Sequence, residues 1–192
     1  MIVIANIFRF AHDLTNCLFL IRTEMPEIVG FEETCPLIKN PFEENALVTG
    51  NPNSSKESIR TFGRCDLFYF SPFIGFTMDC LQSGVLRHIS SPREHQKFFD
   101  GVDNLCATVN LRDIIYLPLV TSDSQIIGVL QFINKQYGTV TQDDINLLTH
   151  MGTTIANCLY IIMKGVRLSL TADRIVGSVQ SVVKPIESKN LL

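Results

Sequence analysis

Charged side chains are scarce in this sequence. Only 18% of its 192 residues are charged, against about 25% in an average protein, while 46% are hydrophobic. These values exclude disordered and fibrous chains, and the length favours one domain. The formal net charge at pH 7 is -3, which disfavours nucleic-acid binding, because a broad basic surface is missing. A surface short of charge is typical of a chain that a partner or a second copy covers.

Patterns that carry catalysis or hold metals are also missing. The six cysteines stand singly, without the short gaps of zinc knuckles or redox motifs, which predicts reduced thiols and a cytoplasmic protein. No histidine has a second ligand at metal-binding spacing, and no P-loop, dinucleotide fingerprint or Gly-x-Ser-x-Gly elbow occurs. A cysteine nucleophile with a distant histidine stays open, but nothing selects one of the six. We therefore predict no catalytic residue, no metal, no cofactor and no enzyme.

Long hydrophobic runs are missing as well. Nowhere do about 20 apolar residues follow one another, so we expect no membrane span. The apolar start, residues 1–5, has no basic stretch before it and is interrupted at once by Asn6 and Arg9, unlike a signal peptide.

The first third of the chain divides into two parts. Its first apolar residues recur at steps of three and four, which predicts an amphipathic helix. These residues are Ile4, Ile7, Phe8, Ala11, Leu14 and Leu18. Residues 24–58 contain four prolines and predict loops and short strands, as a loop-rich insertion would have.

The middle of the chain predicts short elements. Residues 67–70 form an aromatic run that stops at Ser71-Pro72, as a strand would. A short helix is expected from Gly75 to Ser83, with Gly84 as its left-handed end. The sequence Ser91-Pro92-Arg93-Glu94 has the form of a capping box and predicts a helix over residues 92–99.

Two apolar runs, residues 114–120 and 126–133, are separated by five mostly polar residues and predict an antiparallel hairpin. Both faces of the second run are apolar, so we expect helices on both sides of the sheet. Pro118 inside the first run indicates an edge or a bulge.

A long helix is predicted from Thr141 onward. Thr141 and Asp144 can form a capping box, and Val140 can contact Ile145 as a hydrophobic staple. The apolar seam of this helix outruns a compact domain, so residues Thr141–Leu170 are expected to join two copies or to dock on a larger assembly. A longer core helix is the alternative. We expect a single domain over residues 1–166 and an extension or linker over 167–192.

Taken in order, these elements resemble a GAF domain, in particular the regulatory GAF domains of cyclic-nucleotide phosphodiesterases and related cyclases. The likeness covers about residues 75–159 and is best over 115–119, 127–135 and 140–144. It implies an α/β (α+β) fold, a central antiparallel sheet covered by helices on both faces, with long terminal helices.

The family's Asn-Lys-Phe-Asp-Glu signature is incomplete in this sequence. Asn134, Lys135 and Asp144 match, whereas Val140 and Ile145 replace the phenylalanine and the glutamate. Lys135 can pair with Asp144 as part of the scaffold, an alternative to a contact with ligand.

The resemblance also implies a set of residues for binding a cyclic nucleotide. The start of the helix at residue 75 would receive the phosphate, because helix N-termini favour anions. Two residues would lie on the lid side, and two fall where family members often carry threonines. The candidate ligand-binding residues are Gly75, Phe76 and Thr77, then Phe99 and Asp103, then Cys106 and Asn110. Alternatively, Phe76 and Phe99 are core residues and Asp103 caps the turn that follows it.

Two functions follow from the resemblance. The first is a non-catalytic regulatory module that binds a small ligand, with cGMP or cAMP as the first candidate, and signals through its terminal helices in a dimer. The second is a structural or interaction module of a larger assembly, for example a cytoskeletal or ciliary complex, with its pocket filled by its own side chains.

Overall fold

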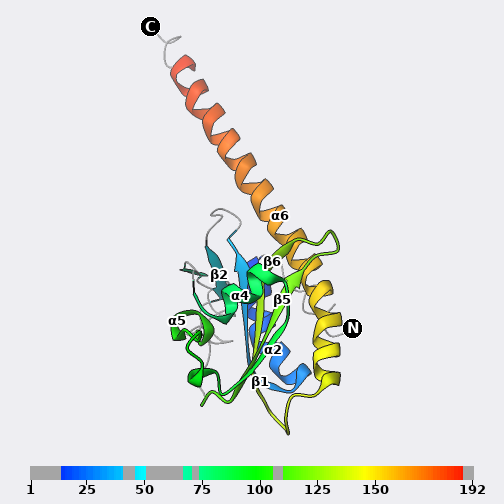
Figure 1. Cartoon of the computed structure of the whole chain (residues 1–192). Coiled ribbons are helices and arrows are strands. Elements are labelled where there is room, and N and C mark those ends of the chain that lie inside the picture. The colour runs from blue at the N-terminus through cyan, green and yellow to red at the C-terminus, as the bar shows by residue number, and fades with distance from the viewer. Residues whose placement is uncertain (1–13, 41–45, 51–66, 71–73, 106–109, 188–192) are drawn as a thin grey trace.

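The computed structural model describes residues 14–40, 46–50, 67–70, 74–105 and 110–187, with the backbone alone for 67–70 and 166–187. A six-stranded antiparallel sheet in the order β3-β2-β1-β6-β5-β4 forms the middle of the molecule (Figure 1). Its strands are β1 Phe31–Lys39, β2 Leu47–Gly50, β3 Leu67–Phe70, β4 Arg87–Ser90, β5 Asp113–Val120 and β6 Ile126–Lys135.

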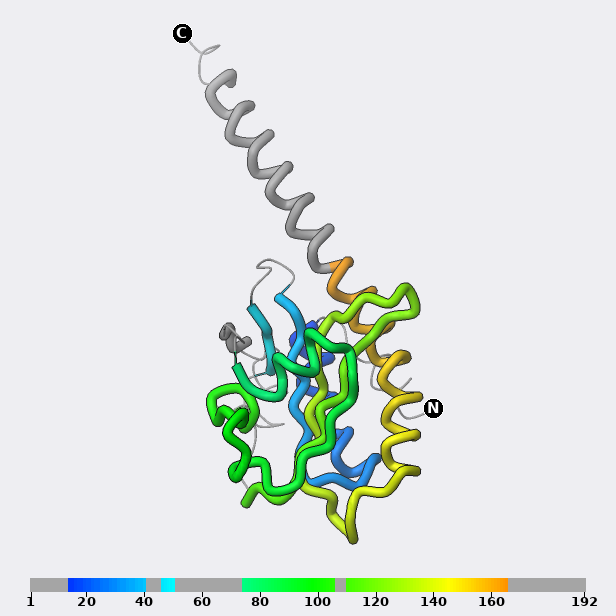
Figure 2. The backbone as a smooth tube through the Cα atoms, viewed as in Figure 1, coloured from blue at the N-terminus to red at the C-terminus, as the bar shows by residue number. Residues whose placement is uncertain are grey.

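Helices cover both faces of this sheet, as predicted. Helices α2, Leu14–Val29, and α6, Gln142–Glu187, lie on one face. Helices α4, Phe76–Ser83, and α5, Asp100–Asp103, lie on the other (Figure 1). Figure 2 shows the same arrangement as a backbone tube. Helix α2 and the first part of α6 lie on the side of the sheet away from α4. Each of the two apolar faces of β5 and β6 packs against one of these helix layers. For this reason the sequence of neither strand alternates between apolar and polar residues.

The hairpin of β5 and β6 is confirmed, with Leu117 opposite Leu130. Pro118 lies past Tyr116, where the pairing of β5 with β4 ends, and the register shifts between Leu119 and Val120. The missing N–H of proline therefore falls where β5 has only one described neighbour, as the prediction of an edge or bulge required.

The prediction of loops and short strands over residues 24–58 is confirmed for the strands β1 and β2, but the interpretation of the first half as a loop-rich insertion was wrong. Helix α2 runs through Pro26 to Val29, and β1 then lies between β2 and β6 near the centre of the sheet. Pro36 stands opposite Leu130, while β2 pairs with β1 only at residues 38 and 39. Prolines had indicated loops, but this one has a described strand on one side alone. Of the predicted first helix, residues 4–13 lie outside the described part of the chain.

The helix predicted over residues 92–99 is also wrong. Only a 3-10 turn, Pro92–Glu94, forms there, and Ser91 makes no capping hydrogen bond from its side chain. The Ser91 N–H instead donates to the Arg112 carbonyl at 2.8 Å, which continues the pairing of β4 with β5. This contact holds Ser91 at a φ of 47°, away from the extended backbone of an N-cap.

The predicted beginning of α6 is confirmed. The Asp144 N–H donates to the Thr141 hydroxyl at 3.2 Å, and the Thr141 N–H donates to the Asp144 carboxylate at 2.9 Å, so the capping box is reciprocal. The helix then continues to Glu187 without a break at residue 166. Residues 142–165 are long and apolar enough, by length and composition, to cross a membrane. The same stretch places Leu148, Ile155 and Leu159 in the core against α2 and the sheet, and a core helix passes the same test.

Candidate functional site

The start of α4, the predicted phosphate site, is occupied by the carboxylate of Asp103. Asp103 is fully buried. Its Oδ2 accepts the N–H groups of Phe76 at 3.0 Å and Phe99 at 3.1 Å. Its Oδ1 accepts the N–H of Thr77 at 2.9 Å and the Thr77 hydroxyl at 2.6 Å. The positive end of a helix attracts an anion, and here the protein supplies that anion itself.

This arrangement changes the role of several predicted residues. Both carboxylate oxygens of Asp103 accept hydrogen bonds from protein groups, and the residue caps α4. It is therefore not available to bind the base or the ribose of a nucleotide. Thr77 is fully buried beside it, and Phe76 packs in the core with Tyr116 and Cys80. Cys106 lies outside the described residues.

Gly75 allows the carboxylate to approach this closely. A Cβ atom at this position would lie 2.5 Å from Asp103 Oδ2. The backbone of Gly75, with φ 100° and ψ 177°, also lies in a region that glycine alone adopts readily. The glycine is therefore explained by the fit to Asp103.

Two polar side chains of the sheet lie beneath α4. Gln131 on β6 donates through Nε2 to the Thr77 hydroxyl at 2.9 Å and to the Val102 carbonyl at 3.0 Å. Tyr116 stands opposite Gln131 in the register. The Tyr116 hydroxyl and the Gln131 Oε1 are both buried without a hydrogen-bond partner. Burial, together with the Asp103 charge, raises the pKa of Tyr116. We had not predicted either residue; their polar character inside two apolar runs was the available signal.

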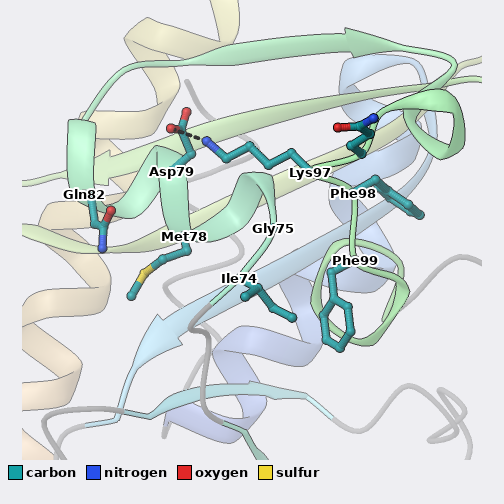
Figure 3. Close-up of a pocket in the computed structure, with 9 residues that line it drawn as sticks. Ile74, Gly75, Met78, Asp79, Gln82, Lys97, Phe98 and Phe99 are labelled. Carbon is teal, nitrogen blue, oxygen red and sulfur yellow. Dashed lines mark hydrogen bonds and ion pairs between the residues drawn. The ribbon is translucent and has the colours of Figure 1, made fainter.

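An open pocket of about 430 Å³ lies on the outer side of α4 (Figure 3). Of the predicted ligand-binding residues, Gly75 and Phe99 line it, with Phe99 44% exposed at the rim. The full lining is Ile74, Gly75, Met78, Asp79, Gln82, Gln96, Lys97, Phe98 and Phe99.

The one cation in this lining is already paired. Lys97 Nζ lies 2.5 Å from Asp79 Oδ1, and Arg87 Nε lies 2.9 Å from Asp79 Oδ2. The hydrogen bonds from Lys97 and Arg87 lower the pKa of Asp79, so the carboxylate stays ionised over the neutral range. An incoming phosphate would have to compete with Asp79 for Lys97.

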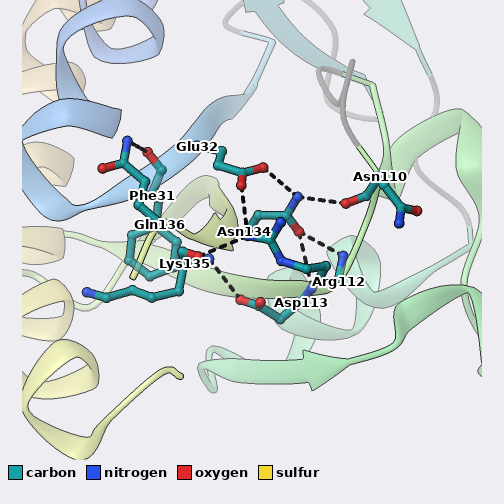
Figure 4. Close-up of polar contacts among 8 residues, drawn as sticks. All are labelled: Phe31, Glu32, Asn110, Arg112, Asp113, Asn134, Lys135 and Gln136. Atoms are coloured by element: carbon teal, nitrogen blue, oxygen red, sulfur yellow. Dashed lines mark hydrogen bonds and ion pairs between the residues drawn. The ribbon is translucent and has the colours of Figure 1, made fainter. Parts of the chain in front are cut away.

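Asn134, from the Asn-Lys pair of the signature, holds the chain segment that enters β5 (Figure 4). It is buried at a φ of 53°. Its Oδ1 accepts the N–H groups of Arg112 at 2.8 Å and Asp113 at 3.3 Å. Its Nδ2 donates to Glu32 and to the Asn110 carbonyl, each at 2.8 Å. Asn110 is thus held by its backbone, and its exposed side chain points away from this network (Figure 4).

Lys135 and Asp144 form the predicted ion pair. Their Nζ and Oδ1 atoms are 2.5 Å apart, and Lys135 Nζ lies 5.0 Å from the centre of the Phe31 ring. The pair joins the end of β6 to the beginning of α6, on the far side of the sheet from α4. This position agrees with a scaffold role.

The capping contacts of Asp144 predict a dependence of stability on pH. Burial raises its pKa, but the hydrogen bonds from Lys135 and Thr141 outweigh burial, so the pKa lies below its usual value. Its contribution is therefore complete above the unfolded pKa of about 3.9 and is lost as the pH falls through the folded pKa. We expect Asp144→Asn to lower the free energy of unfolding by about 1 kcal/mol at pH 7. Urea unfolding at several pH values should show this difference shrinking below pH 4; a difference independent of pH would contradict the assignment.

Thiol chemistry and metal binding find no support in the described residues. Cys17, Cys35 and Cys80 are fully buried, and burial raises the pKa of Cys80 to about 12. The half-buried Cys158 also has a raised pKa, again because of burial. A reactive cysteine needs a lowered pKa and access to solvent. The three buried thiols have no access to solvent, and Cys158, which is partly exposed, has a raised pKa. Within the described part of the chain, no three His, Cys, Asp or Glu side chains gather as a metal site would need.

Comparison with known proteins identifies the fold. No protein-family model matches the sequence, and no curated protein matches it. Solved structures do match. A GAF domain of a phosphoenolpyruvate-protein phosphotransferase from Coxiella burnetii has a TM-score of 0.62 at 12% identity, over 85% of this chain and 93% of its own. The corresponding domain from Acinetobacter gives 0.60 at 11% identity, over 86% and 93%. The free methionine-R-sulfoxide reductase from Neisseria meningitidis, solved with its substrate, gives 0.58 at 14% identity, over 85% and 87%.

Proposed function

We propose that this chain is a non-catalytic regulatory and interaction module of GAF fold, whose site for an anionic ligand is closed by its own Asp103 and whose working surface is α6. The observation that carries the proposal is the buried carboxylate of Asp103, which takes four hydrogen bonds at 2.6 to 3.1 Å at the start of α4. A phosphate at the same place would have to displace it.

The state of the cysteines supports a module without catalysis. The described cysteines are buried or half-buried and form no disulfide, which also suits the cytoplasmic location that we propose. Of the solved structures named above, two are domains of phosphotransferase proteins and one is an enzyme, the methionine-R-sulfoxide reductase. A role inside a larger assembly, such as a cytoskeletal or ciliary complex, belongs to the same proposal.

A cyclic-nucleotide sensor is the second candidate. The specific observation in its favour is the pair of buried polar atoms without partners, the Tyr116 hydroxyl and Gln131 Oε1. Buried polar atoms without hydrogen bonds are uncommon in folded proteins, and a ligand that replaced Asp103 would meet them beneath α4. In this second account, Asp103 leaves the start of α4 when the nucleotide binds.

Thermal unfolding with added nucleotide separates the two candidates. We expect millimolar cGMP or cAMP to leave the melting temperature of the full chain unchanged. A shift that grows and saturates with either nucleotide would overturn the closed site, because a ligand that binds only the folded state stabilises it. In that event Tyr116→Phe should reduce the shift, whereas Asp100→Asn, a change on the exposed side of α5, should not.

A further inference from the structure

Helix α6 carries a second apolar seam besides the one that packs into the domain. The second seam follows steps of four and three residues along the whole helix. It consists of Leu147, Thr154, Cys158, Ile161, Gly165, Leu168, Ala172, Ile175, Val179, Val182 and Ile186. Met151, at the step between Leu147 and Thr154, packs in the domain core instead. Within the described side chains, Leu147 is 50% and Ile161 70% exposed. From Leu147 onward, the charged residues of α6 are Lys164, Arg167, Asp173, Arg174, Lys184 and Glu187, and all of them fall at other positions of the repeat.

This seam needs a partner. Among the described side chains of α6, which end at Gly165, Met163 is the last that packs against the domain core, whereas the helix continues to Glu187, about 36 Å beyond Met163 at 1.5 Å per residue. A single helix in water is marginally stable, and most helices in proteins depend on burying an apolar face.

The sizes of the seam residues indicate what that partner is. Small and large residues alternate through the middle of the seam, from Cys158 through Ile161, Gly165, Leu168 and Ala172 to Ile175. Two parallel copies would set each residue against itself, so that Gly165 met Gly165 and left a void. Two antiparallel copies set a small residue against a large one in every central layer, which fills the space evenly.

We propose that two copies of this chain associate through α6 as an antiparallel pair centred between residues 166 and 167. The central layers are Gly165 with Leu168, Ile161 with Ala172, and Cys158 with Ile175. The same register continues outward as Thr154 with Val179 and Leu147 with Ile186. Met151, at the position opposite Val182, is buried in the domain core and adds no exposed side chain to the pair. The exposed Leu147 and Ile161 thereby become covered. The pairing rests on the proposed role of α6 and is independent of the closed site at α4.

Cross-linking through Cys158 tests this arrangement in the full chain. Cys65 and Cys106 are first replaced by serine, and the buried Cys17, Cys35 and Cys80 remain. With Ile175→Cys added, a short bismaleimide should join Cys158 of one copy to residue 175 of the other in high yield. The chain with Cys158 alone should not cross-link, because the two Cys158 positions lie about 25 Å apart along the antiparallel axis. Efficient cross-linking of Cys158 alone would overturn the antiparallel register.

Sedimentation supplies the second measurement. The parent chain should sediment as a dimer, and Ile161→Asp should sediment as a folded monomer, because Ile161 lies outside the core. Thr153→Asp, on an exposed neighbouring position of the same helix, should remain a dimer. A parent chain that is monomeric at all concentrations would overturn the pairing and leave the closed site untouched, whereas nucleotide binding would do the reverse.

Discussion

Replacing Asp103 by alanine should lower the free energy of unfolding by about 3 kcal/mol, because it strands buried donors at the start of α4. The N–H groups of Phe76, Thr77 and Phe99 and the Thr77 hydroxyl all lose their acceptor. Water has little access to this position, since Thr77 and Asp103 are fully buried. Urea unfolding followed by circular dichroism measures the loss.

Asp100 is the matched control for that variant. It belongs to the same short helix, but its side chain is exposed, and its Oδ1 lies 3.6 Å from Arg93 Nη2. Asp100→Ala should change the free energy of unfolding by less than about 1 kcal/mol, the usual limit for an exposed ion pair. Equal losses for the two variants would show that Asp103 has no special role at α4.

Replacing Gly75 by alanine should cost about 4 kcal/mol, for two separable reasons. The backbone region that Gly75 occupies costs other residues about 1 to 3 kcal/mol, and the added Cβ would lie 2.5 Å from Asp103 Oδ2. Gly84→Ala is the control, since Gly84 also has a positive φ but its Cβ would meet only the end of the Ile126 side chain, at 3.1 Å. That control should cost about 1 kcal/mol.

A double-mutant cycle separates the two costs of Gly75→Ala. In a background of Asp103→Ala the clash is gone, so Gly75→Ala should cost only the backbone part, about 2 kcal/mol. Costs that simply add would contradict the close approach of the carboxylate to Gly75.

Local patterns in the sequence predicted elements well where the neighbouring structure agreed with them. Thr141 and Asp144 form the expected capping box, and Gly84 ends α4 in the left-handed conformation. Ser91 begins a sequence of the same capping form, yet its backbone is held by pairing with Arg112 and no such box forms. The difference lies in a contact between strands, which the four residues of the motif do not contain.

The sequence predicted where the candidate site lies, but not that Asp103 closes it. The resemblance to GAF domains placed Gly75 and Thr77 at the phosphate end of a pocket and Asp103 on its lid side, whereas Asp103 lies against Gly75 and Thr77 at the start of α4. Whether a carboxylate 26 residues away points into the helix start or toward a ligand depends on the path of the chain between the two elements. The central position of β1 was missed for a similar reason, because a proline is tolerated or excluded according to which side of its strand is paired.

The amide signals of Phe76 and Thr77 in a nuclear magnetic resonance titration test the closed site most directly. Both N–H groups donate to Asp103, so their chemical shifts should not move when cGMP or cAMP is added to millimolar concentration, and both should move when Asp103 is replaced by asparagine. A saturable movement of these two signals with either nucleotide in the unmodified chain would contradict the account, because the phosphate would then have taken the place of Asp103.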